Sequence, residues 1–207
     1  VRFRVGLVFQ YPEYQLFDET VRADIAFGPK NMNLSAEECD ARVARAAAFC
    51  GIDETVLSRS PFELSGGQKR RAAIAGVLAM DPEVLVLDEP AAGLDPRGRE
   101  EILGGLMEYQ KQRQSTMLII SHSMEDIAKY ADSILVLKNG KIFLFGTVGE
   151  VFADAQKLFD SSLDLPQITK LFVELQKRGL ADRTDVYTVG YAVKTAAKLA
   201  ENAAKEL

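Results

Sequence analysis

The residues best suited to phosphate chemistry are the five of Leu64–Gln68, with the sequence LSGGQ. Ser65 and Gln68 have the spacing of a capping box, which predicts that an apolar helix begins here. Two adjacent glycines, Gly66 and Gly67, leave the N–H groups of the first turn uncovered, so an anion can bind there. This helix start is a candidate phosphate site, although an ordinary Ser-capped helix would also explain the pentapeptide if it stood alone.

Three cations follow this motif directly, at Lys69, Arg70 and Arg71. The N-terminal end of a helix carries the positive end of its macrodipole, which disfavours cations in the first turns. The position of these side chains therefore predicts that a negatively charged group docks at this end of the helix.

A second candidate set follows the apolar run 84–87, where Asp88 and Glu89 precede a proline. Such a run predicts a strand buried on both faces, as in a parallel sheet. Open α/β sheets bind their ligands at the carboxyl ends of the strands. Asp88 suits a Mg²⁺ ion held through water, and Glu89 suits the position of a base that orients an attacking water. A strand that simply ends in a helix cap would also explain this pair.

Two further polar residues follow predicted strands. His122, the single histidine of the chain, comes after the run 116–120, and Gln10 ends the run 5–9. A histidine at a strand end suits a hydrogen bond to a terminal phosphate, and a glutamine there suits a bridge between metal and water. Alternatively, His122 is a surface or capping residue and Gln10 an ordinary loop residue.

Taken together, these elements resemble the ATPase subunit of an ATP-binding-cassette (ABC) transporter. The resemblance covers residues 5 to about 150 closely and the rest of the chain more loosely. Five motifs of that family occur in its order: the Q-loop glutamine Gln10, the signature Leu64–Gln68, the Walker B strand Val84–Asp88 with Glu89, the D-loop Ala92–Asp95 and the H-loop His122. Five motifs in register leave little room for coincidence.

The resemblance implies an α/β fold: an incomplete P-loop NTPase-type parallel sheet core, an α-helical signature subdomain and a C-terminal helical extension. We expect residues 1–12 and 81–146 in the core, 13–80 in the helical subdomain and 147–207 in the extension. The expected helices begin near residues 18, 35, 65, 96, 147, 166 and 191. The first would be capped by Asp18 and would end near Gly28–Pro29.

The family also implies ATP and Mg²⁺ as cofactors, with each ATP held between two subunits. On the Walker B side, Asp88 would hold the metal's water shell together with Gln10, Glu89 would activate water, and His122 would contact the γ-phosphate. The signature of the other subunit would bind the γ-phosphate from the opposite side. The residues implied on that side are Ser65, Gly66, Gly67, Gln68 and, as a link across the dimer, Asp95.

The family's phosphate-binding loop, G-x-x-x-x-G-K-[ST], does not occur in these 207 residues. Gly140–Lys141 is the only Gly-Lys pair, and Asn139 before it predicts a hairpin turn between two strands. Because the chain begins at Val1 without a methionine, we expect a fragment that lacks this segment and is inactive alone. The family architecture implies that the missing P-loop strand lies next to the Walker B strand.

Residues 9–17, with 20–21 and 26–29, are similar to the energy-coupling-factor branch of prokaryotic importers, which take up vitamins or cobalt and nickel ions. This branch implies three partners: a second ATPase subunit, identical or paralogous, a transmembrane coupling protein and a membrane-embedded substrate-binding component. It also implies a peripheral location at the cytoplasmic face of the cell membrane. The candidates for the coupling surface, or alternatively for ordinary packing and capping, are Tyr11, Glu13, Tyr14, Phe17, Asp18 and Glu19.

Composition narrows the functional classes. A formal net charge of −5 argues against nonspecific nucleic-acid binding, and no apolar run approaches the ~20 residues of a membrane span. Cys39 and Cys50 lack metal-ligand spacing and are expected to be free thiols. Two alternatives to a transport ATPase remain: a noncatalytic module that pairs with a P-loop-bearing ATPase, and a cassette ATPase of DNA repair or translation. The charge and the absence of long insertions disfavour the last.

Overall fold

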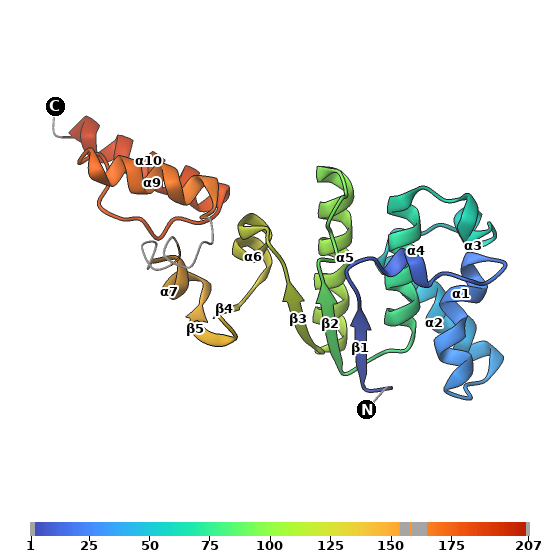
Figure 1. Ribbon diagram of the computed structural model, residues 1–207. Coiled ribbons are helices and arrows are strands. Elements are labelled where there is room, and N and C mark those ends of the chain that lie inside the picture. Colours follow the sequence, from blue (N-terminus) through green and yellow to red (C-terminus); the bar gives the residue numbers. More distant parts are fainter. Residues whose placement is uncertain (1–2, 154–157, 159–164, 206–207) are drawn as a thin grey trace. The chain divides into compact units, whose positions relative to one another are not determined.

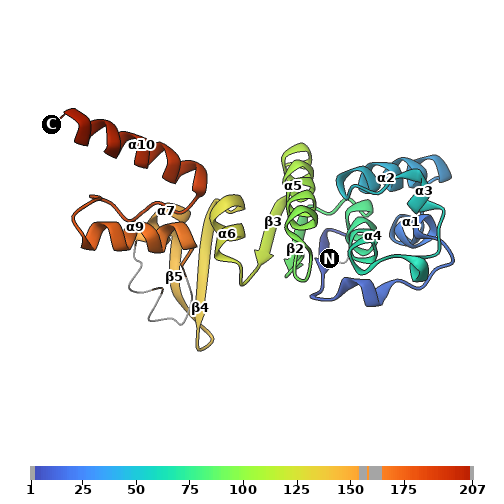
Figure 2. The same ribbon diagram turned by 90° about the horizontal axis from the view of Figure 1, so that it is seen from above.

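The computed structural model describes residues 3–153, 158 and 165–205, which belong to two units, Val1–Ser121 and His122–Leu207. Figure 1 shows the order of their helices and strands along the chain, and Figure 2 shows the same elements from above. The three-part division expected from the sequence stays a prediction. Within the described residues, no helix is both long enough and apolar enough to cross a membrane.

The first unit contains a parallel sheet of β1 (Val5–Val8), β2 (Val84–Asp88) and β3 (Thr116–Ile120), in that spatial order. Parallel pairing between strands so distant in sequence requires helical crossovers, which confirms the predicted α/β class. Leu85 and Leu87, on one face of β2, are fully buried. On the opposite face, Leu118 and Ile120 of β3 are about half exposed. Burial on both faces, as predicted from the apolar runs, is therefore wrong for the described part of the chain.

The sheet order corrects a second expectation. The Walker B strand β2 pairs with β1 on one side and with β3 on the other. A strand has only two hydrogen-bonding edges, so no further strand can lie next to β2. The expectation that the P-loop strand is the neighbour of the Walker B strand is wrong, because β1 and β3 occupy both positions.

The helical part of the first unit consists of short turns η1 (Pro12–Gln15) and η2 (Pro61–Glu63) and helices α1 (Val21–Asn31), α2 (Ala36–Phe49), α3 (Glu54–Leu57) and α4 (Gly66–Ala79). Helix α5 (Pro96–Arg113) links β2 to β3. Gly105 of α5 lies against α2 so closely that a Cβ would stand 1.8 Å from the carbonyl oxygen of Phe49. The contact between α2 and α5 therefore depends on a glycine at this position.

The predicted limits of α1 are wrong. Thr20, not Asp18, is the N-cap, and its hydroxyl accepts a hydrogen bond from the N–H of Ala23 at 3.2 Å. The helix also continues through Gly28 and Pro29 to Asn31. The reason is packing: a Cβ on Gly28 would lie 2.5 Å from the side chain of Met80, so this glycine permits close approach of α1 to α4 and does not end the helix.

The second unit contains α6 (Met124–Tyr130), the antiparallel hairpin β4 (Ser133–Lys138) and β5 (Lys141–Thr147), and α7 (Val148–Ala153). Asn139 and Gly140 both have positive φ, 52° and 72°, as a two-residue type I′ turn requires. The prediction that Gly140–Lys141 belongs to a hairpin is confirmed. Side chains of α6, β4 and α7 share one apolar core.

The described part of the second unit also contains helices α9 (Gln167–Lys177) and α10 (Val189–Lys205), which share a second small core around Phe172 and Val186. Pro166 precedes α9 and Gly179 follows it with a φ of 71°, as predicted. The helix expected from residue 147 is seen as α7 up to Ala153. Residues 154–157 and 159, over which we expected it to continue, lie outside the described part of the chain.

Candidate functional site

Three of the polar residues predicted at strand ends, Gln10, Asp88 and Glu89, lie at the carboxyl-terminal side of the sheet. Gln10 follows β1, and Asp88 ends β2 opposite Ile120 of β3. Because the strands are parallel, their carboxyl ends share this side. His122 follows β3 in sequence but is the first residue of the second unit. Its role beside the other strand ends stays a prediction.

Glu89 has a left-handed backbone with a φ of 50°, which is uncommon for a residue other than glycine. Its N–H donates to the carbonyl of Ile120 at 3.0 Å, and its own carbonyl accepts from the N–H of Ala92 at 3.1 Å. These two bonds hold the residue in a conformation that costs about 1–3 kcal/mol, and such costs cluster at functional sites. The strained backbone therefore supports a functional interpretation of Glu89 over a plain strand exit.

The start of α4 has the predicted capping box. The hydroxyl of Ser65 accepts from the N–H of Gln68 at 3.3 Å, and the side-chain oxygen of Gln68 accepts from the N–H of Ser65 at 3.1 Å. Among the described residues, nothing accepts a hydrogen bond from the N–H of Gly66 or Gly67. A Cβ on Gly66 would meet nothing within 4 Å, so the packing of this chain does not require a glycine there.

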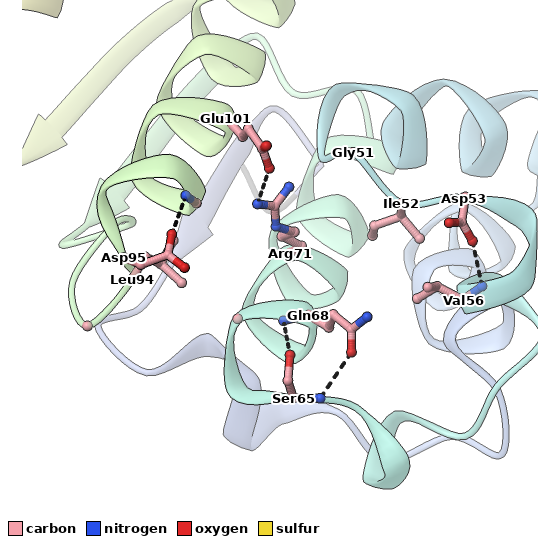
Figure 3. A pocket seen from close by; sticks show the side chains of 13 residues that line it. Gly51, Ile52, Asp53, Val56, Ser65, Gln68, Arg71, Leu94, Asp95 and Glu101 are labelled. Carbon is pink, nitrogen blue, oxygen red and sulfur yellow. Dashed lines mark hydrogen bonds and ion pairs between the residues drawn. The ribbon is translucent and has the colours of Figure 1, made fainter.

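A cavity of about 560 Å³ opens beside this helix start (Figure 3). Three segments line it: residues 51–56, the beginning of α4, and residues 93–101. Asp95 is the N-cap of α5, and one of its carboxylate oxygens accepts from the N–H of Gly98 at 2.6 Å. Leu94 limits the space at Gly67, where a Cβ would come within 3.3 Å of it. The D-loop and the signature therefore form one continuous surface.

The three cations that follow the signature led to the prediction that a negatively charged group docks at this end of α4. For Arg70 and Arg71 an external group is not needed, because their acceptors lie within the chain. Arg71 donates to the carboxylate of Glu101 at 2.6 Å and to the carbonyl of Cys50 at 3.2 Å. Hydrogen bonds from Arg71 and then from Arg97 hold the pKa of Glu101 below its ordinary value. Internal acceptors, which sequence spacing does not reveal, satisfy these cations at the start of the helix.

Arg70 is the functional candidate that the sequence did not single out. Its side chain is only 4% exposed and reaches three acceptors: the carboxylate of Glu13 and the carbonyls of Gln10 and Ala92. Two of these acceptors belong to the segments that carry Gln10 and Glu89. A basic residue after the signature gives no sign of this burial, because its partners lie up to 60 positions away in sequence.

The surface around η1 divides into an inner and an outer side. Tyr11, Tyr14 and Phe17 are exposed by 54%, 85% and 58%. Glu13 lies between them in sequence but directs its carboxylate inward to Arg70. Asp18 accepts from the N–H of Glu19. The three aromatic residues and Glu19, which is also exposed, are therefore the parts of the predicted coupling surface that are open to solvent.

The strand-end residues fit the Mg²⁺ ion that was expected there. The side chains of Gln10 and Asp88 supply oxygen donors, and in the described part of the chain neither has a hydrogen-bond partner. No group of three or more His, Cys, Asp or Glu residues suited to a metal occurs among the described residues. Carboxylate and amide oxygens suit Mg²⁺, because this ion prefers oxygen ligands and retains much of its water shell.

Comparison with known proteins identifies the family of the chain. The family model described as ABC transporter matches residues 1–92. The chain is 52% identical over 205 residues to energy-coupling factor transporter ATP-binding protein EcfA2 of Clostridium tetani, covering 99% of this chain and 71% of that protein. It is 55% identical over 189 residues to EcfA2 of Caldanaerobacter subterraneus subsp. tengcongensis, covering 91% and 66%.

Two solved structures share the fold. One is cbiO1 from Clostridium perfringens, described as part of the ABC transporter complex cbiONQ, with 41% identity, a TM-score of 0.69 and coverage of 86% of this chain and 66% of that one. The other is a dimeric ATP-binding cassette in a post-hydrolysis state with ADP and phosphate, with 26% identity, a TM-score of 0.61 and coverage of 70% and 62%. The expected family is thereby confirmed: the chain belongs to the ABC transporter ATPases, in the branch of the energy-coupling factor transporter ATP-binding proteins.

Proposed function

We propose that this chain is the ATP-binding and ATP-hydrolysing subunit of a prokaryotic energy-coupling-factor importer at the cytoplasmic face of the membrane. The proposal is carried by the placement of Gln10, Asp88 and Glu89 at one sheet edge, in a chain 52% identical to an EcfA2 protein. Vitamins or cobalt and nickel ions are the cargo classes that the branch suggests, and another subunit would select among them.

In this proposal the strand ends prepare the attack of water on the γ-phosphate of ATP. Glu89 accepts a hydrogen bond from the attacking water and orients it, since its backbone is fixed by the bonds to Ile120 and Ala92. Asp88 and Gln10 would hold Mg²⁺ through its waters. When bound, the ion neutralises the charge that develops on the phosphate oxygens. His122 would donate to the γ-phosphate.

The start of α4 would bind the γ-phosphate of the ATP held by a second ATPase subunit. The N–H groups of Gly66 and Gly67 are available, and the hydroxyl of Ser65 can donate while it accepts from Gln68. Asp95, beside them in the same cavity, would contact the second subunit. The dimeric state of a solved relative that holds ADP and phosphate supports this arrangement.

The coupling surface would be the exposed aromatic residues Tyr11, Tyr14 and Phe17. Aromatic side chains exposed by more than half are suited to bind apolar helix ends of a transmembrane protein. The remaining partner, the membrane-embedded substrate-binding component, would act through that transmembrane protein.

A noncatalytic role is the second candidate. These 207 residues contain the signature but no G-x-x-x-x-G-K-[ST] motif. In that case the chain would offer its α4 surface and coupling surface to a P-loop-bearing partner without hydrolysing ATP at its own strand ends. We expect the 207-residue chain by itself to bind ATP analogues weakly, and calorimetry beside a longer form of the protein would measure this.

The experiment that tests the proposal compares the full-length protein with its Glu89→Gln variant. We expect phosphate release to fall by about 10²–10⁴-fold, because the base is lost, while binding of a nonhydrolysable ATP analogue persists. Glu108→Gln is the matched control, since Glu108 lies on α5 and, among the described residues, accepts a hydrogen bond only from Gln112. Unchanged hydrolysis in Glu89→Gln would favour the noncatalytic role for this chain's strand ends.

A further inference from the structure

Arg70 joins three segments of the first unit through one buried guanidinium. Its Nη2 donates to the carbonyl of Gln10 at 3.0 Å and to Glu13 Oε1 at 3.3 Å, and its Nε donates to Glu13 Oε2 at 3.2 Å. Its Nη1 donates to the carbonyl of Ala92. The side chain of Glu13 is only 20% exposed, so the pair is largely shielded from solvent screening.

Each of these segments carries a residue of the proposed reaction. Gln10 belongs to the first segment, and Ala92 lies in the loop between Glu89 and Asp95. Arg70 itself follows Gly66 by one helical turn on α4. A guanidinium is planar and its donors are fixed relative to one another, so the positions of its acceptors are tied to a single rigid group.

We propose that Arg70 is a positioning residue for ATP hydrolysis, which fixes the Gln10 segment against the 89–95 loop and passes movements of η1 to that loop. The inference rests on the proposed function and adds the route by which the partner surface reaches the strand ends. Glu13 lies on η1, directly between the exposed Tyr11 and Tyr14. A partner that displaces these aromatic residues also displaces the carboxylate bound to Arg70.

The burial of Arg70 makes this link costly to break. If Glu13 moves and Arg70 does not, a guanidinium that is 4% exposed loses the only charged partner that it has among the described residues. A buried charge without its partner is strongly unfavourable. The favourable response is a concerted shift of η1, the beginning of α4 and the Ala92 carbonyl, which changes the setting of Glu89 three residues earlier.

Arg42 provides a matched control for a purely structural role. It also donates from a guanidinium to backbone carbonyls of another helix, at 2.9 Å to Met80 and 3.5 Å to Ala79. These carbonyls lie at the other end of α4, away from the segments of Gln10 and Glu89. A substitution of Arg42 therefore tests the loss of an arginine that bridges two elements without touching the proposed linkage.

The test measures kcat and KM for ATP in the full-length protein assembled with its membrane partners, for Arg70→Lys, Arg70→Gln, Glu13→Ala and Arg42→Gln. Lysine keeps the charge but cannot reach three acceptors at once. We expect kcat to fall about tenfold in Arg70→Lys and Glu13→Ala, since misplacement of reacting groups lowers the rate. KM should stay within about twofold, and Arg42→Gln should keep the wild-type kcat at temperatures where it is folded.

The double variant Arg70→Gln with Glu13→Ala completes a double-mutant cycle on kcat. If the two side chains act as one link, the kcat of the double variant is no lower than that of Arg70→Gln alone. A kcat within about twofold of wild type in both Arg70→Lys and Glu13→Ala would overturn the inference, whatever their urea midpoints. If Arg70→Gln does not fold, Arg70→Lys decides the question, because lysine keeps a cation beside Glu13. Failure of the proposed function is distinct: the wild type and Glu89→Gln would then release phosphate equally.

Discussion

The strand ends and the start of α4 leave different chemical groups open. At the strand ends the backbone is satisfied: Asp88 pairs with β3, and the N–H of Glu89 bonds to Ile120. The side chains of Gln10 and Asp88 are the groups without a hydrogen-bond partner among the described residues. This region therefore offers side-chain oxygens to whatever binds there.

The start of α4 shows the reverse pattern. Most of its polar side chains have partners within the chain, as seen in the Ser65–Gln68 capping box and in the pair of Arg71 with Glu101. The open groups are main-chain N–H groups of two glycines. A side-chain substitution at the strand ends should therefore change ATP hydrolysis, whereas one at the start of α4 should mainly change the stability of the fold. At α4, a methyl group added to a glycine should weaken the binding of phosphate to the N–H groups.

The largest expected effect that separates the two regions comes from Asp88→Asn. The substitution is isosteric and removes the charge that would hold the metal's waters, so ATP hydrolysis should fall about 10–100-fold. The urea midpoint should not change, because Asp88 makes no side-chain hydrogen bond within the described residues. Phosphate release at several Mg²⁺ concentrations is the measurement, and partial recovery at high Mg²⁺ is expected. A lower urea midpoint with unchanged hydrolysis would mean that the Asp88 side chain serves the fold and not the chemistry.

Gly66→Ala tests the role of the main-chain N–H groups at the start of α4. A Cβ at this position meets nothing within 4 Å of the chain, so the free energy of unfolding should stay the same or rise by up to about 1 kcal/mol. The same methyl group would lie where a phosphate must approach the N–H groups, and hydrolysis should fall by about tenfold, or ~1.4 kcal/mol. Gly104→Ala is the control, because its Cβ also meets open space but lies on α5. Equal activity of both variants would remove Gly66 from the binding surface.

Local signals in the sequence were sufficient for much of this arrangement. The capping box at Ser65 and Gln68, the Asn-Gly turn at residue 139 and the start of α5 at Pro96 are all as predicted. Each depends on residues within four positions of one another, and their backbone preferences need no tertiary information. The candidate residues at the ends of β1 and β2 could be predicted for the same reason.

Features set by distant contacts could not be predicted. Gly28 has the appearance of a helix stop, but its contact with Met80 keeps it inside α1. Arg70 has the appearance of a surface cation, but Glu13 and Gln10 bury it. The neighbours of β2 likewise follow from pairing between strands about 80 and 30 positions away. In each case the deciding partner lies on another element, and one sequence does not show which elements meet.

Ser65→Ala gives a smaller effect and compares the α4 start with a helix that has no proposed site. Loss of the cap should cost about 1 kcal/mol of unfolding free energy in urea. Ser35→Ala removes the equivalent capping box of α2, whose bonds measure 3.1 and 3.2 Å, and should cost the same. Only Ser65→Ala should reduce hydrolysis, and by less than Gly66→Ala, because the main-chain N–H groups remain. Equal activity of the two serine variants would mean that the Ser65 hydroxyl serves the fold alone.

The smallest expected effect is the pH dependence of the stability that the ion pair between Arg71 of α4 and Glu101 provides. It tests whether side chains at the start of α4 stabilise the fold. Hydrogen bonds from Arg71 and Arg97 lower the pKa of Glu101 from 4.5. A lowered pKa in the folded state means that the stabilisation is present above pH 4.5 and is lost as the pH falls through the folded value. The urea midpoint of Glu101→Gln should therefore lie slightly below that of the wild type at pH 7 and converge with it once the pH falls below the lowered pKa of Glu101. Glu108→Gln on the same helix should show no such convergence, because Glu108 has no cation partner among the described residues.

Because Glu101 is exposed, 1 M salt should reduce the difference in urea midpoint at pH 7. A difference that persists in salt would mean that Glu101 stabilises the fold through packing and not through its charge.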